Sequence, residues 1–490
     1  MQRGVMMADI CIGFEVHQPY RLDREFSAVP KEKKQDLSRL YFNGLNKEIL
    51  LRVAEKCYNP ATTLILEKLD EGFSCSFSLS GIVIEQLQRW SPDTLSLFEQ
   101  VADHRNCELI GQTYYHSIAS CFSDKTEFRE QVRQHADLVH DLFSVRLAIF
   151  ENTEFAFNNE VAKIILDMGF AGIFTEGVDR VLGKRSPDYL YTCQDLPVLL
   201  RNTKLSDDIA LRFANMTWDQ YPLTADTYAQ WVATSPGDFI SVFLDYETFG
   251  EHFLKETGIF DFLRYLPGEL HNHDVQTVLP SQVVADRTPA GTIDVHETIS
   301  WADLEKDTSA WMGNERQRTA FHAVQSARPY VADLPIWRYL QTSDHFFSMA
   351  SRYGSSGELH TQFSHHEAEE AFKTYMRVLS DYEARNIRVM KNKKSAKTLR
   401  ALSPEQAFHF AGPTGFVGYV AYNLDQFLEL LSIVPNESIR YHQERGDFVN
   451  WITGVLGEPK LAEYISGLSE RHELITAVSE RREQLWSNLK

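Results

Sequence analysis

The chain has 490 residues, of which 43% are hydrophobic and 24% charged, and its formal net charge is −19. This composition is typical of a soluble globular protein, and the length predicts two or three domains because one hydrophobic core rarely supports so many residues. The acidic balance argues against a nucleic-acid binder or an anionic-membrane binder, since both need a basic surface. No run reaches the roughly 20 apolar residues of a membrane span, and the N-terminus lacks a secretory cleavage site, so we expect a cytoplasmic protein.

Cysteine usage gives no indication of a disulfide scaffold or a zinc site. The cysteines are scattered, with no CxxC pair and no histidine at zinc-ligand spacing: Cys11, Cys57, Cys75, Cys107, Cys121 and Cys193. The HNHD segment at 271–274 is better explained as a solvated loop than as an ion site. We therefore expect no metal and no other cofactor.

Short apolar runs with strand-like composition alternate with segments of helical period over the first 300 residues. The runs lie at 9–16, 73–79, 108–112, 146–151, 171–175, 197–201 and 239–245. Between two of them, Ile84, Leu87 and Trp90 recur every third position, which is typical of one helix face. Seven strands alternating with helices predict an α/β class domain with a parallel, barrel-like sheet over residues 8–300.

The pattern changes after residue 300. Residues 301–390 show longer helical periods without strand alternation, which indicates a helical bundle packed beside the barrel. A basic, polar run at 385–400 has the composition of a solvated linker. Residues 401–490 then form a small, mostly helical accessory module, whose role does not follow from its residues.

Polar side chains stand where several of the predicted strands end. FISVFLDYETFGEH at 239–252 delivers Asp245 and Glu247 to the end of the last strand, and RLAIFENTE at 146–154 delivers Glu154 in the same way. His17 follows the first strand and Gln112 ends the third. Because the carboxyl ends of barrel strands meet at one mouth, we expect opposing acids in a single cleft.

The polar side chains at the strand ends suit cleavage of a glycosidic bond. One carboxylate can attack or stabilise the anomeric carbon, a second can protonate the leaving oxygen, and neutral donors can hold hydroxyl groups. Aromatic residues offer flat faces for a pyranose. Taken alone, each acid or histidine could have a purely structural role, as a helix cap or as a hydrogen-bonded buried residue. Their joint occurrence in the same register favours a functional cleft.

The motifs resemble a known family in both sequence and order. They are HQPYRL at 17–22, GQTYYHS at 111–117, FENTEFAFNN at 150–159, LDYETFGEH at 244–252 and ETISWAD at 297–303. These five segments are similar to the signature regions of glycoside hydrolase family 57, most closely its α-amylase branch. The resemblance implies a (β/α)7 barrel, an incomplete TIM-type barrel, followed by a helical bundle. It also implies a retaining mechanism on the α-1,4 bonds of starch, glycogen or maltooligosaccharides.

Carried over by position, the family's nucleophile falls on Glu154 and its general acid/base on Asp245. The resemblance implies that Glu154 forms a covalent glycosyl-enzyme while Asp245 protonates the leaving oxygen, the two carboxyls being about 5 Å apart. We predict that burial and the negative charge of Glu154 raise the pKa of Asp245, so that it keeps its proton near neutral pH. The candidates for binding substrate hydroxyls are His17, Gln112, His116, Glu247, His252, Trp301, Asp303, Asp344 and His345.

Three other functions stay open at the level of sequence. A 4-α-glucanotransferase or branching enzyme would use the same carboxylates but exclude water. A metal-dependent polysaccharide deacetylase would need a cluster such as HxxxH plus Asp, and no HxxxH lies near the strand ends. A noncatalytic glucan-binding protein would keep the aromatic residues without needing both acids. The sequence carries no signal for an oligomeric state.

Overall fold

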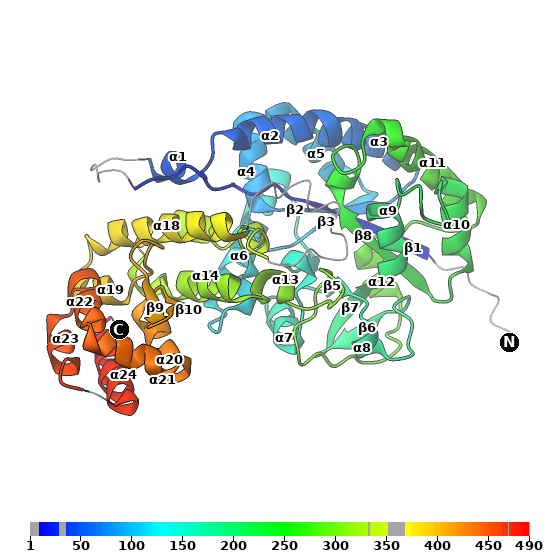
Figure 1. Ribbon diagram of the computed structural model, residues 1–490. Helices are drawn as coiled ribbons and strands as arrows, with labels where there is room; N and C mark the ends of the chain where they lie inside the picture. The colour runs from blue at the N-terminus through cyan, green and yellow to red at the C-terminus, as the bar shows by residue number, and fades with distance from the viewer. Residues whose placement is uncertain (1–8, 29–35, 332–333, 351–367, 469, 490) are drawn as a thin grey trace.

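The structure is a computed structural model that describes residues 9–28, 36–331, 334–350, 368–468 and 470–489. An α/β barrel occupies the N-terminal part, helices α14 and α18 extend from it, and the C-terminal helices lie at the far end of these two (Figure 1). None of the described helices is long and apolar enough to cross a membrane.

The barrel is built from seven parallel strands, as the sequence predicts. They follow the order β3-β2-β1-β8-β7-β5-β4, and a bridge between Gly111 and Phe150 joins the two edges. A short additional strand, β6, pairs antiparallel with β7 and was not expected. The strands are β1 (Asp9–Val16), β2 (Cys75–Leu79), β3 (Cys107–Ile110), β4 (Ile149–Glu151), β5 (Gly172–Glu176), β6 (Tyr191–Cys193), β7 (Leu196–Arg201) and β8 (Phe239–Asp245).

The strands are nearly continuous apolar runs because helices and loops cover the outside of the barrel while side chains fill its inside. In β1 every residue after Asp9 is buried. Register brings Glu15 on β1 beside Asp245 on β8, both at the carboxyl ends of their strands. Functional residues that follow the strands therefore share one mouth.

Helices flank the barrel strands and begin at ordinary capping residues. Ser80 and Asn158 accept backbone N–H groups at the starts of α4 and α7, and Ile84 and Leu87 are buried on one face of α4, as the periodicity predicts. The helices of this region are α1 (Leu37–Tyr41), α2 (Leu45–Val53), α3 (Asn59–Asp70), α4 (Gly81–Trp90), α5 (Pro92–Asp103), α6 (Thr126–Phe143), α7 (Asn159–Asp167), α8 (Asp179–Leu182), α9 (Thr203–Ala210), α10 (Ala225–Thr234), α11 (Ile259–Asn272) and α12 (Pro280–Asp286).

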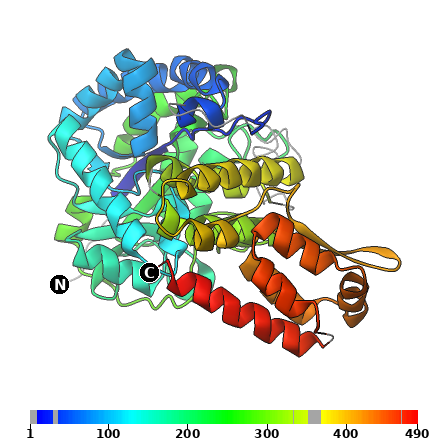
Figure 2. The same ribbon diagram turned by 90° about the vertical axis from the view of Figure 1, so that its left-hand side faces the viewer.

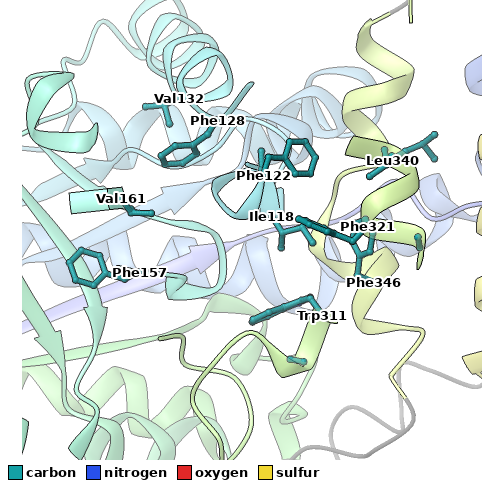
Figure 3. Close-up of a cluster of buried hydrophobic side chains, with 14 of the residues drawn as sticks. Ile118, Phe122, Phe128, Val132, Phe157, Val161, Trp311, Phe321, Leu340 and Phe346 are labelled. Carbon is teal, nitrogen blue, oxygen red and sulfur yellow. The ribbon is translucent and has the colours of Figure 1, made fainter. Parts of the chain in front are cut away.

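The helical region after the barrel shares one hydrophobic core with it. Phe122 and Phe128 from the barrel lie in the same buried cluster as Trp311, Phe321 and Phe346 (Figure 3). This region therefore packs directly against the barrel. Its helices are α13 (Ser309–Met312), α14 (Glu315–Ser326), α15 (Leu334–Tyr339), α16 (Ser343–Phe347), α18 (Ala368–Ile387) and α19 (Lys393–Leu399).

The prediction of a solvated linker at 385–400 is wrong. Most of this run is helical, because α18 extends to Ile387 and α19 follows. Ala396 and Leu399 are buried on one face of α19, whereas the neighbouring lysines are exposed. The basic composition hid this short amphipathic pattern.

The C-terminal residues have a core of their own, which includes Phe408, Phe427 and Leu485. Besides helices, they contain an antiparallel hairpin of β9 and β10 that helical periodicity did not indicate. Figure 2 shows the long last helix, α24, along the lower edge of this module. The elements are β9 (Phe408–Gly412), β10 (Gly415–Ala421), α20 (Leu424–Ile433), α21 (Asn436–Glu444), α22 (Asp447–Trp451), α23 (Pro459–Ile465) and α24 (Arg471–Ser487).

Candidate active site

A cleft of about 400 Å³ opens at the carboxyl ends of the barrel strands. Residues of α16 and α18, including Asp344 and Tyr375, line its other side. The cleft collects almost all of the residues predicted from the sequence: His17, His116, Glu154, Asp245, Glu247, His252, Trp301, Asp303, Asp344 and His345.

Glu154 lies on a short turn directly after β4 in the left-handed backbone region, with φ 59° and ψ 22°. Non-glycine residues rarely adopt this conformation, and strain of this kind is concentrated at functional sites. The turn presents the carboxylate to the indole Nε1–H of Trp301, which donates to Oε2 over 2.7 Å, and to the Ser343 hydroxyl, which donates to Oε1 over 3.0 Å. His116 Nε2 lies 3.7 Å from the same Oε1.

These donors decide the ionisation of Glu154. Burial acts to raise its pKa, but hydrogen bonding and positive charge from His116, together with the Trp301 N–H, outweigh burial and lower the pKa below its usual value. Glu154 is therefore a carboxylate at neutral pH, in the state that a nucleophile requires.

Asp245 is the last residue of β8, and its pKa is shifted in the opposite direction from that of Glu154. Burial, followed by the negative charge of Glu154, raises the pKa of Asp245 to about 7, in the direction predicted from the sequence. Two carboxyl groups whose surroundings push their pKa values apart are the usual arrangement for a nucleophile and a general acid.

His17 and His116 stack on each other with ring centroids 3.9 Å apart. Burial and the nearby His116 lower the pKa of His17 to about 4, so His17 is neutral at neutral pH. Its Nε2 lies 3.1 Å from Asp344 Oδ2 and its Nδ1 lies 2.8 Å from the Ser80 hydroxyl. The contact between His17 and Asp344 joins the end of β1 to α16 on the other side of the cleft.

Glu247 lies beside Asp245 and is also held neutral. Burial, followed by the charge of Asp245, raises the pKa of Glu247 to about 8. Its Oε1 accepts hydrogen bonds from the Tyr58 hydroxyl and from Gln18 Nε2. A neutral carboxyl group at the cleft wall can both donate to and accept from a sugar hydroxyl.

Trp301 is held by a buried arginine that sequence reasoning missed. The Arg201 guanidinium lies 5.6 Å from the centre of the Trp301 ring and forms ion pairs with Glu176 and Asp207 at 3.0 and 2.7 Å. The sequence feature that could have identified Arg201 is its position as a charged residue at the end of the apolar run 197–201. Ser343 was also missed, and nothing local distinguishes it from other serines.

Gln112 is the one predicted site residue that does not line the cleft. It is buried beneath the floor, where its amide nitrogen donates to Glu15 Oε1 and Ser78 Oγ over 2.9 and 2.8 Å. Its Oε1 lies 3.1 Å from His116 Nδ1. The structure thus places Gln112 behind His116 and leaves the predicted contact with substrate untested.

Comparison with known proteins agrees with this geometry. Residues 11–296 match the model of glycosyl hydrolase family 57. The chain belongs to this family. It is 42% identical over 395 residues, covering 76% of this chain and 84% of the relative, to a Methanocaldococcus jannaschii protein whose name assigns it provisionally to the α-amylases. As a family 57 glycoside hydrolase, the chain has a barrel mouth equipped for glycosidic bond chemistry.

Two solved structures of glucan-active enzymes share the fold of this glycoside hydrolase. A GH57 branching enzyme from Thermococcus kodakaraensis aligns with a TM-score of 0.57 at 12% identity, over 79% of this chain and 92% of that one. A 4-α-glucanotransferase from Thermococcus litoralis aligns with a TM-score of 0.50 at 14% identity, over 81% of this chain and 61% of that one. Family membership decides against the deacetylase alternative.

Proposed function

We propose that this family 57 enzyme hydrolyses α-1,4-glucosidic bonds of starch, glycogen or maltooligosaccharides with retention of configuration. The observation that carries the proposal is the pair of cleft carboxyls with opposed ionisation, Glu154 as a carboxylate and Asp245 as an acid with a pKa of about 7. The 42% identical relative named for α-amylase activity supports the substrate class.

In the first step, Glu154 attacks the anomeric carbon while Asp245 gives its proton to the departing glycosidic oxygen. The bond from the anomeric carbon to that oxygen breaks, and a covalent glycosyl-enzyme forms through Glu154. In the second step, Asp245 takes a proton from water, whose oxygen attacks the anomeric carbon and releases Glu154. Each step inverts the anomeric centre, so the two together retain it.

The remaining cleft residues are proposed to bind and orient the glucan. Trp301 offers a ring face, while Glu247 and His252 present polar groups to sugar hydroxyls. Asp344 and His345 lie on α16, and we propose that residues 301–390 act with the barrel of residues 8–300 to complete the binding site. Since α16 and α18 line one side, the substrate is held between the two regions.

Product analysis tests this proposal directly. Purified enzyme is incubated with maltoheptaose and with soluble starch, beside Glu154→Ala, Asp245→Ala and Glu108→Gln. Glu108 lies on β3 away from the cleft, where its Oε2 accepts the Ser281 N–H, and it serves as the control for changing a barrel glutamate. We expect shorter maltooligosaccharides with new reducing ends, abolished in the two cleft variants and retained in the control.

The same assay distinguishes the other glucan-active function. Longer products at a constant number of reducing ends would show transfer to a sugar hydroxyl, and the enzyme would then be a glucanotransferase or branching enzyme. No turnover of any glucan by the wild-type chain would overturn the proposal.

A further inference from the structure

Two glutamates that the mechanism does not use interact at the bottom of the cleft, whose lining includes Glu15 but not Glu151. Glu15 on β1 and Glu151 on β4 are 3% and 2% exposed, and their carboxyl groups lie close enough for one to donate a hydrogen bond to the other once it carries a proton. Gln112 donates to Glu15 Oε1 over 2.9 Å, and the Ser78 hydroxyl donates to Glu151 Oε1 over the same distance. Both carboxyls are thus part of one buried hydrogen-bonded cluster.

Two ionised carboxylates cannot hydrogen bond to each other, because each can only accept. Glu15 Oε2 is buried and, within the described part of the chain, has no hydrogen-bond donor facing it. A proton on Glu15 removes this conflict, since the protonated carboxyl can donate to Glu151. Burial and then the charge of Glu151 raise the pKa of Glu15 well above its ordinary value, which agrees with this reading.

The hydrogen-bond pattern then determines the charge of His116. The Gln112 amide nitrogen donates to Glu15 and to Ser78, so its Oε1 can only accept from His116 Nδ1, 3.1 Å away. Glu15 Oε1 also faces this Nδ1, at 3.4 Å. On the other side of the ring, Nε2 faces the carboxylate of Glu154, which also only accepts. Protons on both ring nitrogens satisfy both partners, and His116 is then an imidazolium.

We propose that Glu15 and Glu151 share a single proton and that this singly charged pair, both directly and through Gln112, keeps His116 positively charged beside the nucleophile. Glu15 and Glu151 are positioning residues in this proposal, which rests on the proposed function of Glu154. The pair supplies one negative charge to offset the imidazolium in the barrel interior. The charges of Glu154 and Asp344 also raise the pKa of His116 against burial, and the charge of Glu151 adds to them. Without the charge of the pair, His116 would lose its proton at lower pH, and Glu154 would then lose the positive charge 3.7 Å from its Oε1.

The surrounding charges are consistent with one negative charge in the pair. The titratable groups that act on it are Asp245, His116 and Glu154, of which only His116 is positive. Asp245 keeps its proton up to a pKa of about 7. A second negative charge in the pair would lie beside the carboxylate of Glu154 in a buried region, which is unfavourable.

The proposal predicts different effects of single and double isosteric substitutions. Glu15→Gln keeps a donor toward Glu151 and an acceptor for Gln112, so it imitates the protonated acid, and we expect kcat to fall by less than about threefold. Glu151→Gln leaves Glu15 free to ionise beside His116 Nδ1, so this variant also keeps one negative charge and should lose little activity. The double variant Glu15→Gln/Glu151→Gln removes that charge, and we expect its kcat to fall by about tenfold to a hundredfold while KM changes little. Glu108→Gln is the matched barrel control.

Two further measurements separate positioning from a merely structural role. In the double variant His116 should lose its proton at lower pH than in wild type, and NMR titration of the His116 ring follows this proton separately from Asp245, which sets the alkaline limb of the activity profile. Infrared difference spectra of wild type against Glu15→Gln at neutral pH should show the loss of one protonated carboxyl band. This second measurement needs no substrate, so it is independent of whether the chain hydrolyses glucans.

A double variant whose kcat equals that of the single variants would overturn the proposal, and so would a large loss of kcat in either single variant. An infrared difference without a protonated carboxyl band would also overturn it. If the wild-type chain fails to act on any glucan while the band is lost in Glu15→Gln, the shared proton stands and the proposed function fails. Circular dichroism and thermal unfolding of each variant show whether it folds.

Discussion

Trp301 donates its indole N–H to Oε2 of Glu154 over 2.7 Å, although the two residues lie 147 positions apart in the chain. Trp301→Phe keeps the ring but removes this charged hydrogen bond. We expect kcat to fall by about tenfold to a hundredfold and the acid limb of the pH profile to move to higher pH, because the pKa of Glu154 rises. Trp231→Phe on α10 is the control, and steady-state kinetics over a pH series is the measurement. An unmoved acid limb would contradict this role.

Activity should decline on the alkaline side as Asp245 loses its proton. Its pKa of about 7 predicts a limb of kcat/KM near that pH, while the acid limb lies below the ordinary glutamate value of about 4.3 because the pKa of Glu154 is lowered. A 4-nitrophenyl α-maltooligosaccharide has a leaving group that needs little protonation, so its alkaline limb should be weaker. Identical alkaline limbs for this substrate and for maltoheptaose would argue against Asp245 as the acid.

Ionisation of the buried Asp245 should lower the free energy of unfolding of the wild-type protein above neutral pH. Its folded pKa of about 7 exceeds the ordinary value, so its contribution to the free energy of unfolding is intact below about pH 3.9 and is lost as the pH rises through 7. Asp245→Asn should therefore unfold at a higher temperature than wild type at about pH 8, and the difference should shrink as the pH falls toward about 4. Thermal unfolding across pH measures this. A stability gain that is constant with pH would point to a cause other than ionisation.

Azide rescue should assign the two carboxyls by stereochemistry. With an activated α-glucosyl fluoride, Glu154→Ala lets azide attack the substrate directly and should give a β-glycosyl azide. Asp245→Ala still forms the glycosyl-enzyme, and azide should then give an α-glycosyl azide. Without azide, we expect activity on maltoheptaose to fall by roughly 10⁴-fold or more in the first variant and roughly 10²- to 10⁴-fold in the second. Proton NMR of the products decides, and the opposite anomers would exchange the two roles.

Arg201 should stabilise the folded protein as well as position the Trp301 ring. Its guanidinium forms two ion pairs and donates to the Phe243 carbonyl, a geometry that lysine cannot reproduce. Arg201→Lys is expected to lower the free energy of unfolding by about 2–4 kcal/mol. Urea denaturation tests this beside Arg264→Lys, whose exposed pair with Glu67 should contribute less than about 1 kcal/mol. Similar losses in both variants would contradict the importance of the buried network.

Much of the fold and the content of the cleft followed from local sequence. The apolar runs are long enough to identify each barrel strand, and polar residues such as His17 and Asp245 stand where those runs end. Parallel strands bring their carboxyl ends together, so residues distant in the chain could be assigned to one mouth. β6 was not predicted because it has only three residues. The hairpin of β9 and β10 was not predicted because β10 is mostly solvent-accessible and lacks the apolar run that marks the barrel strands.

The tertiary structure decided the chemistry of these residues. Ionisation depends on burial and on neighbours, so the difference between Glu154 and Asp245 exists only once the barrel is closed. Ser343 reaches Glu154 from 189 positions away, and no local pattern distinguishes such a serine. Gln112 belongs to the same motif as His116, yet packing turns its side chain beneath the floor. Sequence determines which groups arrive at the mouth, and three-dimensional packing determines which of them keep a proton, because only packing sets their solvent and their partners.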